Sequence, residues 1–389
     1  MVPAPAGLPQ SPYAGPRFPA PPVTAVPLPP AVPSAAGPVK VALLVPLSGP
    51  NAELGKSMLE AAQLALFTTE SGRLTLIPRD TAGTAEGAVA AARSALGEGA
   101  RLILGPLLAA EVEAVKPVAR EAKVNVIAFT TQIQAAGGNV FLIGFLPRQE
   151  VMREVAFARE RGLSRFAALA PNAAYGRLMG EALRESATAS GGSVGRIEFF
   201  EARAGDLAAA VQRLLSGGSA APGAGGAASP AFDALLLPAG GAQLQQIARQ
   251  LKEAGLDTAK VRLLGSGLWD DTSIAGEPAL YGGWFAASPP AARREFASRF
   301  QATYGHSAPR LASLAFDAAA LAAVLAKSGG DDPFTQEAIL NPSGFTGVDG
   351  LFRFTQAGLV QRGLAVLEVQ PQGNVVVSPA PQSFRDLGS

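Results

Sequence analysis

The sequence predicts an α/β protein with two lobes, each a mostly parallel sheet flanked by helices. Short apolar segments that suit buried strands alternate with segments of helical period along most of the chain, and short loops join them. This alternation runs twice, with a restart near Leu146, which indicates two sheets of similar size. A cleft between two such lobes is a common place for a small ligand to bind.

The first strand–loop–helix unit, Val39–Phe67, shows the pattern clearly. Val41–Leu47 is apolar and long enough for a buried parallel strand, and helical spacing of apolar residues begins near Glu53. The loop between them lies at the carboxyl end of a strand, where open α/β sheets bind their ligands. Ser48 and Asn51 are therefore candidate ligand contacts, although Ser48 could instead only terminate the strand.

Further strand–helix units complete the first lobe. Thr84 is a plausible N-cap for the helix that follows it. Four strand–helix steps with short loops predict a right-handed parallel sheet. The predicted strands are 73–79, 101–104, 124–129 and 140–144, and the predicted helices are 85–96 and 109–122.

The second run of elements begins after Leu146. Residues 216–231 are rich in Gly, Ser and Ala and predict a low-complexity surface loop, and Asp206 is expected to cap the helix before it. The chain closes with 350–354 and 363–370, which are spaced like an antiparallel strand pair. The predicted strands between are 165–170, 193–199, 232–237, 261–264 and 281–286, with helices 149–161, 177–190, 207–215, 243–254, 291–303 and 311–326.

Composition excludes several classes of site. The 389 residues contain no cysteine, which rules out disulfides and thiolate metal sites, and their formal net charge of +1 gives no reason to expect nucleic acid. The single histidine, His306, lies in a turn-like stretch without a nucleophile elbow or metal-ligand spacing around it. We therefore expect a non-enzymatic protein with no metal and no other cofactor.

Gly49–Ser57 (GPNAELGKS) is close to the phosphate-binding pattern G-x-x-x-x-G-K-[ST]. Five residues rather than four separate Gly49 from Gly55, and Pro50 lacks one of the N–H donors that would hold a phosphate. We expect instead that Gly55 lets the helix pack closely and that Lys56 is solvated.

Two stretches bear on the membrane. Residues 1–38 are rich in Pro, Ala and Val with almost no charge, which predicts an extended, disordered tether without the apolar core of a signal peptide. Ala312–Ala326 is the longest apolar stretch, but it contains Asp317 and is shorter than the ~20 residues that a membrane span needs. No transmembrane segment is therefore expected.

Several motifs follow one another in a fixed order between Pro38 and about Ser378: Val41–Gly55, Pro78–Asp80, Ile103–Pro106 (ILGP), Val126–Thr131 (VIAFTT), Ala170–Gly176 (APNAAYG) and Phe345–Phe354 (FTGVDGLFRF) with Gly358. Taken in this order, they resemble the periplasmic two-lobe binding proteins of the leucine/isoleucine/valine-binding type. The resemblance implies the type I fold of that family, in which the chain crosses between the lobes three times. It implies one lobe of 39–145 with 283–329 and another of 146–282 with 330–378, followed by a tail, 379–389.

Within that family the chain is similar to the penicillin-binding protein activators, which are exported and stimulate peptidoglycan synthases by protein contact. The stretches APNAAYGR, FDALLLPAGG, LLGSGLWDD and GGWFAA carry this likeness, together with the Pro-rich N-terminal stretch. It implies a periplasmic or cell-envelope location, with an export signal expected upstream of a misassigned start, and a peptidoglycan synthase as partner. The alternative is the solute-binding component of an amino-acid ABC transporter, with an ABC permease as partner and a small amino-acid-like ligand.

The leucine-binding type grips the ligand's charged groups with a hydroxyl after the third strand, a Thr after the fourth, a Tyr in the Y-G turn and an acid in the second lobe. Here the loop 107–110 has no hydroxyl, and the acidic position falls near Ser266 or Gly267, with no carboxylate before Asp270. An ammonium without its carboxylate would lose a charge-assisted hydrogen bond of ~1.5–3 kcal/mol. Trp269 either contacts the ligand or packs in the core. The candidate cleft residues are Ser48, Asn51, Leu107, Leu108, Ala109, Thr130, Thr131, Tyr175, Gly241, Ser266, Trp269 and Asp270.

Overall fold

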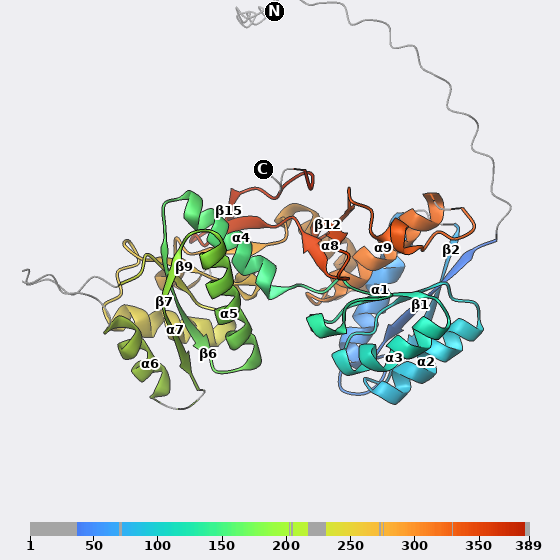
Figure 1. Ribbon diagram of the computed structural model, residues 1–389, viewed down its shortest axis with the longest axis horizontal. Helices are drawn as coiled ribbons and strands as arrows, with labels where there is room; N and C mark the ends of the chain where they lie inside the picture. Colours follow the sequence, from blue (N-terminus) through green and yellow to red (C-terminus); the bar gives the residue numbers. More distant parts are fainter. Residues whose placement is uncertain are drawn as a thin grey trace, which may run out of the picture. The chain divides into compact units, whose positions relative to one another are not determined.

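Two sheets with helices packed on both faces organise the computed structural model (Figure 1). The structure describes residues 37–69, 72–201, 203, 205–216, 231–271, 274, 276–328 and 330–385. Over these residues the first sheet has five strands in the order β2-β1-β3-β4-β5, and the second has seven in the order β15-β14-β10-β9-β8-β6-β7. The predicted α/β class with two sheets is confirmed. The predicted tether and most of the predicted loop 216–231 lie outside the described residues.

The first sheet is parallel throughout, and both of its faces are buried. Along its first strand, Leu43 packs in one hydrophobic core with the helices α1 and α9, and its neighbour Leu44 packs in another with α2 and α3. The hydroxyl of Thr84 accepts a hydrogen bond from the Gly87 N–H, so Thr84 is the N-cap that the sequence predicts. The elements are β1 (Val39–Val45), α1 (Ala52–Thr68), β2 (Leu74–Asp80), α2 (Ala85–Gly97), β3 (Leu102–Leu104), α3 (Ala109–Glu121), β4 (Asn125–Ala128), the 3-10 helix η1 (Ile133–Ala135) and β5 (Val140–Leu142).

The second sheet has parallel strands at its centre and antiparallel strands at one edge. Phe166 and Leu169 of β6 again point to opposite sides, toward a core with α4 and α5 and a core with α6 and α7, respectively. The elements are α4 (Pro147–Glu160), β6 (Arg165–Pro171), α5 (Ala174–Ala189), β7 (Ser193–Phe200), α6 (Asp206–Leu215), β8 (Ala234–Leu236), α7 (Gly241–Glu253), β9 (Arg262–Leu264), the 3-10 helices η2 (Gly267–Trp269) and η4 (Pro278–Leu280), β10 (Trp284–Ala287), β14 (Ala365–Glu368) and β15 (Val375–Ser378).

The remaining elements return to the first lobe. The helix α9 lies against α1, and Phe352 and Val360 of the small three-stranded sheet β11-β12-β13 belong to the same hydrophobic core. Figure 1 shows α8 and α9 on the side of α1 rather than among the helices α5, α6 and α7 of the second sheet. These elements are α8 (Pro290–Tyr304), α9 (Ala312–Ser328), α10 (Gln336–Ile339), β11 (Phe345–Gly347), β12 (Gly350–Phe354) and β13 (Val360–Arg362).

The structure differs from the predicted lobe boundaries at two places. Residues 284–287 were assigned to the first lobe, but as β10 they pair with β9 and β14 of the second sheet. Residues 334–362 were assigned to the second lobe, but their buried apolar side chains, from Phe334 to Val360, pack in the core of the first. An apolar pattern predicts that a strand is buried, but it does not identify the sheet that buries it.

Two local predictions also need correction. The segments 350–354 and 363–370 do not pair with each other, because β12 pairs with β11 and β13 while β14 pairs with β10 and β15. Asp206 does not cap α6, since Gly205 occupies the N-cap position and the Asp206 carboxylate instead accepts the Glu201 N–H at 2.5 Å.

The Gly49–Ser57 stretch has a packing role. Gly55 lies inside α1, and a Cβ atom there would sit 1.8 Å from the backbone oxygen of Pro46, so the helix approaches the end of β1 as closely as glycine alone allows. Lys56 is exposed and pairs with Glu53 at 3.2 Å, as expected for a solvated lysine. The described residues contain no helix that combines the length and the apolar character of a membrane span.

Candidate functional site

A cavity of about 340 Å³ is lined by residues of both lobes, at the carboxyl ends of parallel strands and at the crossovers between the lobes. Its volume is within the range of small-molecule sites. One part of its wall is apolar, and the rest carries hydroxyl groups and charges. The lining residues are Thr131, Phe145, Pro147, Glu150, Tyr175, Gly267, Leu268, Asp270, Ala287, Ser288, Arg310, Leu311 and Leu364.

Glu150, in the first turn of α4, supplies a carboxylate that the sequence analysis did not find. Its Oε2 accepts the Gly267 N–H at 2.9 Å, at the loop position where the resemblance implies an acidic residue. Burial raises the pKa of Glu150 from its usual 4.5 to about 7, and the charge of Asp270 adds to the rise, while the Gly267 N–H and Arg310 oppose it. The Glu150 carboxylate, which comes from α4, therefore lies beside the loop position, near Gly267, where the resemblance implies an acidic residue.

Glu154 lies one helical turn further along α4 and holds the helix to the second sheet. Its Oε1 accepts the Ala286 N–H at 2.8 Å, and the side chain is buried. Burial raises the pKa of Glu154 well above its usual value, and the nearby Glu150 adds to this effect. Two acidic groups thus lie on the inner face of one helix, beside the cavity.

Tyr175 and Ser266, both predicted site residues, are hydrogen-bonded through their side chains. Tyr175 lies at the start of α5, where Gly176 is required because a Cβ there would be 2.0 Å from the Pro171 oxygen. Burial raises the pKa of the Tyr175 hydroxyl, so the group remains a neutral donor and acceptor. Ser266 is itself buried, and its Oγ accepts the Leu268 N–H at 3.3 Å.

Arg310 is the basic residue of the cavity wall. Its guanidinium lies 3.8 Å from the ring centre of Phe145, and its Nη2 contacts Asp349 Oδ1 at 2.9 Å and Ser288 Oγ at 3.3 Å. Its Nη1 donates to Ser313 Oγ at 2.9 Å. Two of its five N–H donors have no partner among these contacts, so the side chain keeps capacity for a ligand.

Arg310 belongs to a group of four charged residues that we call the hinge charge cluster: Arg310, Asp317, Asp349 and Arg362. Arg362 is 3.8 Å from Asp317 and donates to the Ile143 oxygen at 2.7 Å. Burial and the charge of Asp349 raise the pKa of Asp317 to about 7; burial acts on Asp349 too, but Arg310 and Arg362 hold its pKa below the usual value. The cluster contacts all three crossovers, near Ile143, Ser288 and Arg362 itself.

Two other predicted residues, Thr131 and Asp270, also line the cavity. Thr131 is exposed and follows β4, where the resemblance implies a hydroxyl contact. Asp270 forms an ion pair with Arg293 of α8. The structure therefore brings together Thr131, Tyr175 and Asp270, with Ser266 directly behind Tyr175.

The predicted residues of the first-strand loop are placed differently. Ser48 donates from its hydroxyl to Asp80 Oδ2 at 2.6 Å, and the N–H groups of Leu47 and Ser48 donate to Asp80 Oδ1, so Ser48 holds the loop to β2. Asn51 occupies the N-cap position of α1 without a side-chain hydrogen bond to the helix. Neither Ser48 nor Asn51 is among the residues that line the cavity.

The other predicted residues also lie outside the cavity lining. Trp269 is fully buried in the second lobe, where its indole N–H donates to the Leu237 oxygen at 3.2 Å, so it is a core residue rather than a ligand platform. Thr130 is buried, and its Oγ1 accepts the Gln132 N–H. Leu107 is buried, Leu108 precedes α3, Ala109 is the half-buried first residue of α3, and Gly241 begins α7.

Sequence reasoning missed Glu150 and Arg310. A signal for the first was present, because Glu150 and Glu154 are four residues apart in a predicted helix whose buried face includes Val151 and Val155. Acidic residues on a buried helix face call for a partner or a function. Arg310 had no comparable signal, since it lies in an irregular stretch between two helices. Among the described residues, no group of three or more His, Asp or Glu side chains is placed to hold a metal ion.

The comparisons with known proteins agree with this architecture. Residues 38–374 match a family model described as "Periplasmic binding protein", while a search of curated proteins finds no significant match. Among solved structures, a branched-chain amino-acid ABC transporter periplasmic ligand-binding protein from Burkholderia xenovorans is similar, with a TM-score of 0.68 and 21% identity over 87% of this chain and 94% of that one. LivJ from Streptococcus pneumoniae in complex with isoleucine is similar with a TM-score of 0.60 and 19% identity, over 88% of this chain and 100% of LivJ. A solute-binding protein from R. palustris in complex with benzoate is similar with a TM-score of 0.60 and 20% identity, over 89% of this chain and 98% of that protein. At these identities the solved structures show a shared fold.

Proposed function

This chain belongs to the periplasmic binding protein family, whose model matches residues 38–374, and from that premise we propose that it is a solute-binding protein. It holds a small amino-acid-like molecule in the 340 Å³ cavity and presents it to an ABC permease in the periplasm. It binds this molecule without changing it chemically. The penicillin-binding protein activator role that the sequence suggested becomes the second candidate.

One observation carries the proposal: a basic and two acidic side chains line the same apolar-walled cavity. A free amino acid needs a cationic partner for its carboxylate and an anionic partner for its ammonium group. Arg310 offers the first with its unused N–H donors, and Glu150 offers the second, since the contact with Gly267 engages only one of its oxygens. Leu268 and Leu311 lie in the same wall and suit an apolar side chain.

The balance of charge favours an amino acid over a simple carboxylate such as benzoate. Two acidic residues, Glu150 and Asp270, line the cavity, and Asp270 is already paired with Arg293, which leaves Glu150 and Arg310 to meet a ligand. A ligand with only a negative charge would engage Arg310 but leave Glu150 without a partner, whereas an amino acid also offers an ammonium group to Glu150. The ligands in the similar structures, isoleucine and benzoate, share a carboxylate, so the ammonium group is the feature that separates them.

A ligand panel tests the proposal. Branched and polar amino acids, together with benzoate, are titrated against the chain by calorimetry and thermal shift; a ligand at 100 times its Kd adds ~2.7 kcal/mol of stability. At least one amino acid should bind, and benzoate should not. Glu150→Gln should weaken amino-acid binding about tenfold or more, because it removes a charge-assisted hydrogen bond of ~1.5–3 kcal/mol.

Glu160→Gln is the matched control, because Glu160 is exposed at the end of the same helix and should leave affinity unchanged. Tighter binding of benzoate than of every amino acid would contradict the assignment of the ammonium site. Equal affinity of Glu150→Gln and the wild type would contradict the role of Glu150.

The second candidate is activation of a peptidoglycan synthase by protein contact. The observation that favours it is the loop after β3, where Leu107, Leu108 and Ala109 replace the hydroxyl that amino-acid binders of the leucine type use. It is tested by adding the chain to a purified synthase and measuring glycan polymerisation and complex formation. No binding of any ligand in the panel, together with faster glycan polymerisation by the synthase, would favour this candidate over solute binding.

A further inference from the structure

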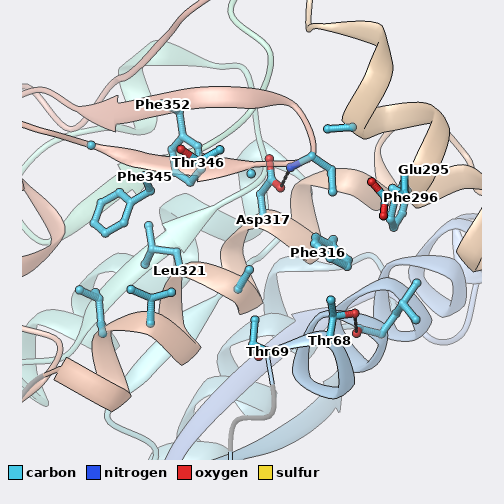
Figure 2. A pocket seen from close by; sticks show the side chains of 18 of the residues that line it. Thr68, Thr69, Glu295, Phe296, Phe316, Asp317, Leu321, Phe345, Thr346 and Phe352 are labelled. Carbon is cyan, nitrogen blue, oxygen red and sulfur yellow. Dashed lines mark hydrogen bonds between the residues drawn. The ribbon is translucent and has the colours of Figure 1, made fainter. Parts of the chain in front are cut away.

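A second cavity, larger than the first, opens on the first lobe between α1, α8, α9 and β11 (Figure 2). Its volume is about 570 Å³, and it shares no lining residue with the solute cavity. Figure 2 shows aromatic rings around it, with Phe296 and Phe316 on one side and Phe345 and Phe352 on the other. Leu321 of α9 adds to this apolar wall.

The polar groups of this cavity are already engaged or lie at its rim. The Asp317 carboxylate accepts the Val348 N–H at 2.7 Å and belongs to the hinge charge cluster. Glu295 and Arg299, four residues apart on α8, pair with each other and are 62% and 54% exposed. The interior therefore suits an apolar group, and the rim carries one charge of each sign.

Phe67 is an exposed aromatic side chain beside this cavity. At 77%, it has the highest exposure of the large apolar residues in the described part of the chain. It follows Leu64 by three residues on α1 and directly precedes Thr68, and both of those residues line the cavity. Val324 of α9, which is also a lining residue, is 49% exposed. An apolar knob thus stands beside an apolar hole, and exposed apolar patches of this kind mark interaction sites.

We propose that this surface binds a second copy of the chain, with Phe67 of each copy inserted into the aromatic cavity of the other. A two-fold interface uses the same patch on both partners, so the patch must be complementary to itself. A knob beside a hole meets that condition in shape. The rim meets it in charge, since Glu295 of one copy can face Arg299 of the other. The dimer leaves the solute cavity free, because the two cavities share no residue.

The test is the oligomeric state of the full chain, measured by sedimentation velocity and light scattering over a range of concentrations. The wild type should dimerise. Phe67→Ala should raise the dissociation constant about a hundredfold, because each lost aromatic anchor costs about tenfold and symmetry removes two at once. Val324→Glu should also weaken the dimer, since it places a charge in the cavity wall at an exposed helical position that tolerates glutamate.

Met152→Ala is the matched control, because Met152 is an exposed apolar residue (52%) on α4, away from the cavity lining. It should dimerise like the wild type. A chain that stays monomeric up to about 1 mM overturns the proposal. A dimer that Phe67→Ala and Val324→Glu leave as stable as the wild type overturns it as well.

Discussion

Replacing Glu150 by glutamine should stabilise the protein at alkaline pH and at the same time weaken ligand binding. Glutamine has nearly the same shape and keeps an oxygen that can accept the Gly267 N–H, which Glu150 engages at 2.9 Å. It removes only the charge. Sites that hold a charged group for function often reduce stability in this way.

The size of the effect follows from the raised pKa. In the folded protein, the pKa of Glu150 is about 7 rather than the 4.5 of an unperturbed side chain, so the folded state binds the proton more tightly than the unfolded state does. Stability from this proton is complete below pH 4.5 and is lost as the pH rises through about 7. At 1.36 kcal/mol per pKa unit, and with a discount for the side chain's partial exposure to the cavity, the wild type should lose roughly 2 kcal/mol more than the variant between about pH 5 and pH 8.

The assay is urea unfolding at both pH values, followed by tryptophan fluorescence. Trp269 and Trp284 are both buried in the second lobe, which also holds α4 and Glu150, so the signal reports the lobe that is perturbed. Glu160→Gln, on the exposed end of α4, should follow the wild type at both pH values. If wild type and Glu150→Gln lose stability in parallel, Glu150 is not held in a desolvated site and the reasoning from burial is wrong.

Three further predictions concern stability and are checked by urea unfolding followed by far-UV circular dichroism. Asp349→Asn should cost about 3 kcal/mol, because it leaves the buried Arg362 with Asp317 as its single carboxylate partner; an unchanged midpoint would argue against the hinge charge cluster. Gly55→Ala should destabilise by about 2–3 kcal/mol despite the better helix propensity of alanine, because the new Cβ would lie 1.8 Å from the Pro46 oxygen, and a stabilised variant would contradict this packing. Asp80→Asn should cost about 1–2 kcal/mol by weakening the hydrogen bonds that hold the Ser48 loop. Hydrogen bonds from Ser48 and neighbouring N–H groups outweigh burial and lower the pKa of Asp80, so the difference in stability should vanish as the pH falls through that lowered pKa. A difference that persists in acid would count against this role of Asp80.

The sequence alone was sufficient for most of the elements and for the two-sheet architecture. Strand β1 and helix α1 were predicted within a few residues, because burial on both faces of a strand and on one face of a helix leaves a periodic record in the local sequence. Thr84 was predicted as an N-cap for the same reason, since a cap contacts only its own helix. The resemblance to a known family indicated Tyr175 of the Y-G turn and Thr131, and both line the cavity.

Tertiary structure decided which sheet each late strand joins and which charges meet in the cavity. Strands β10 and β14 read like any other buried strands, and only long-range pairing shows that they belong to the second sheet. Glu150 and Arg310 are 160 residues apart, and they reach the same cavity because the crossovers bring α4 and the loop before α9 together. Burial of Trp269 likewise depends on strands and helices remote from it in sequence. Local periodicity records whether a residue is buried, whereas its neighbours in space are set by contacts that no short stretch of sequence contains.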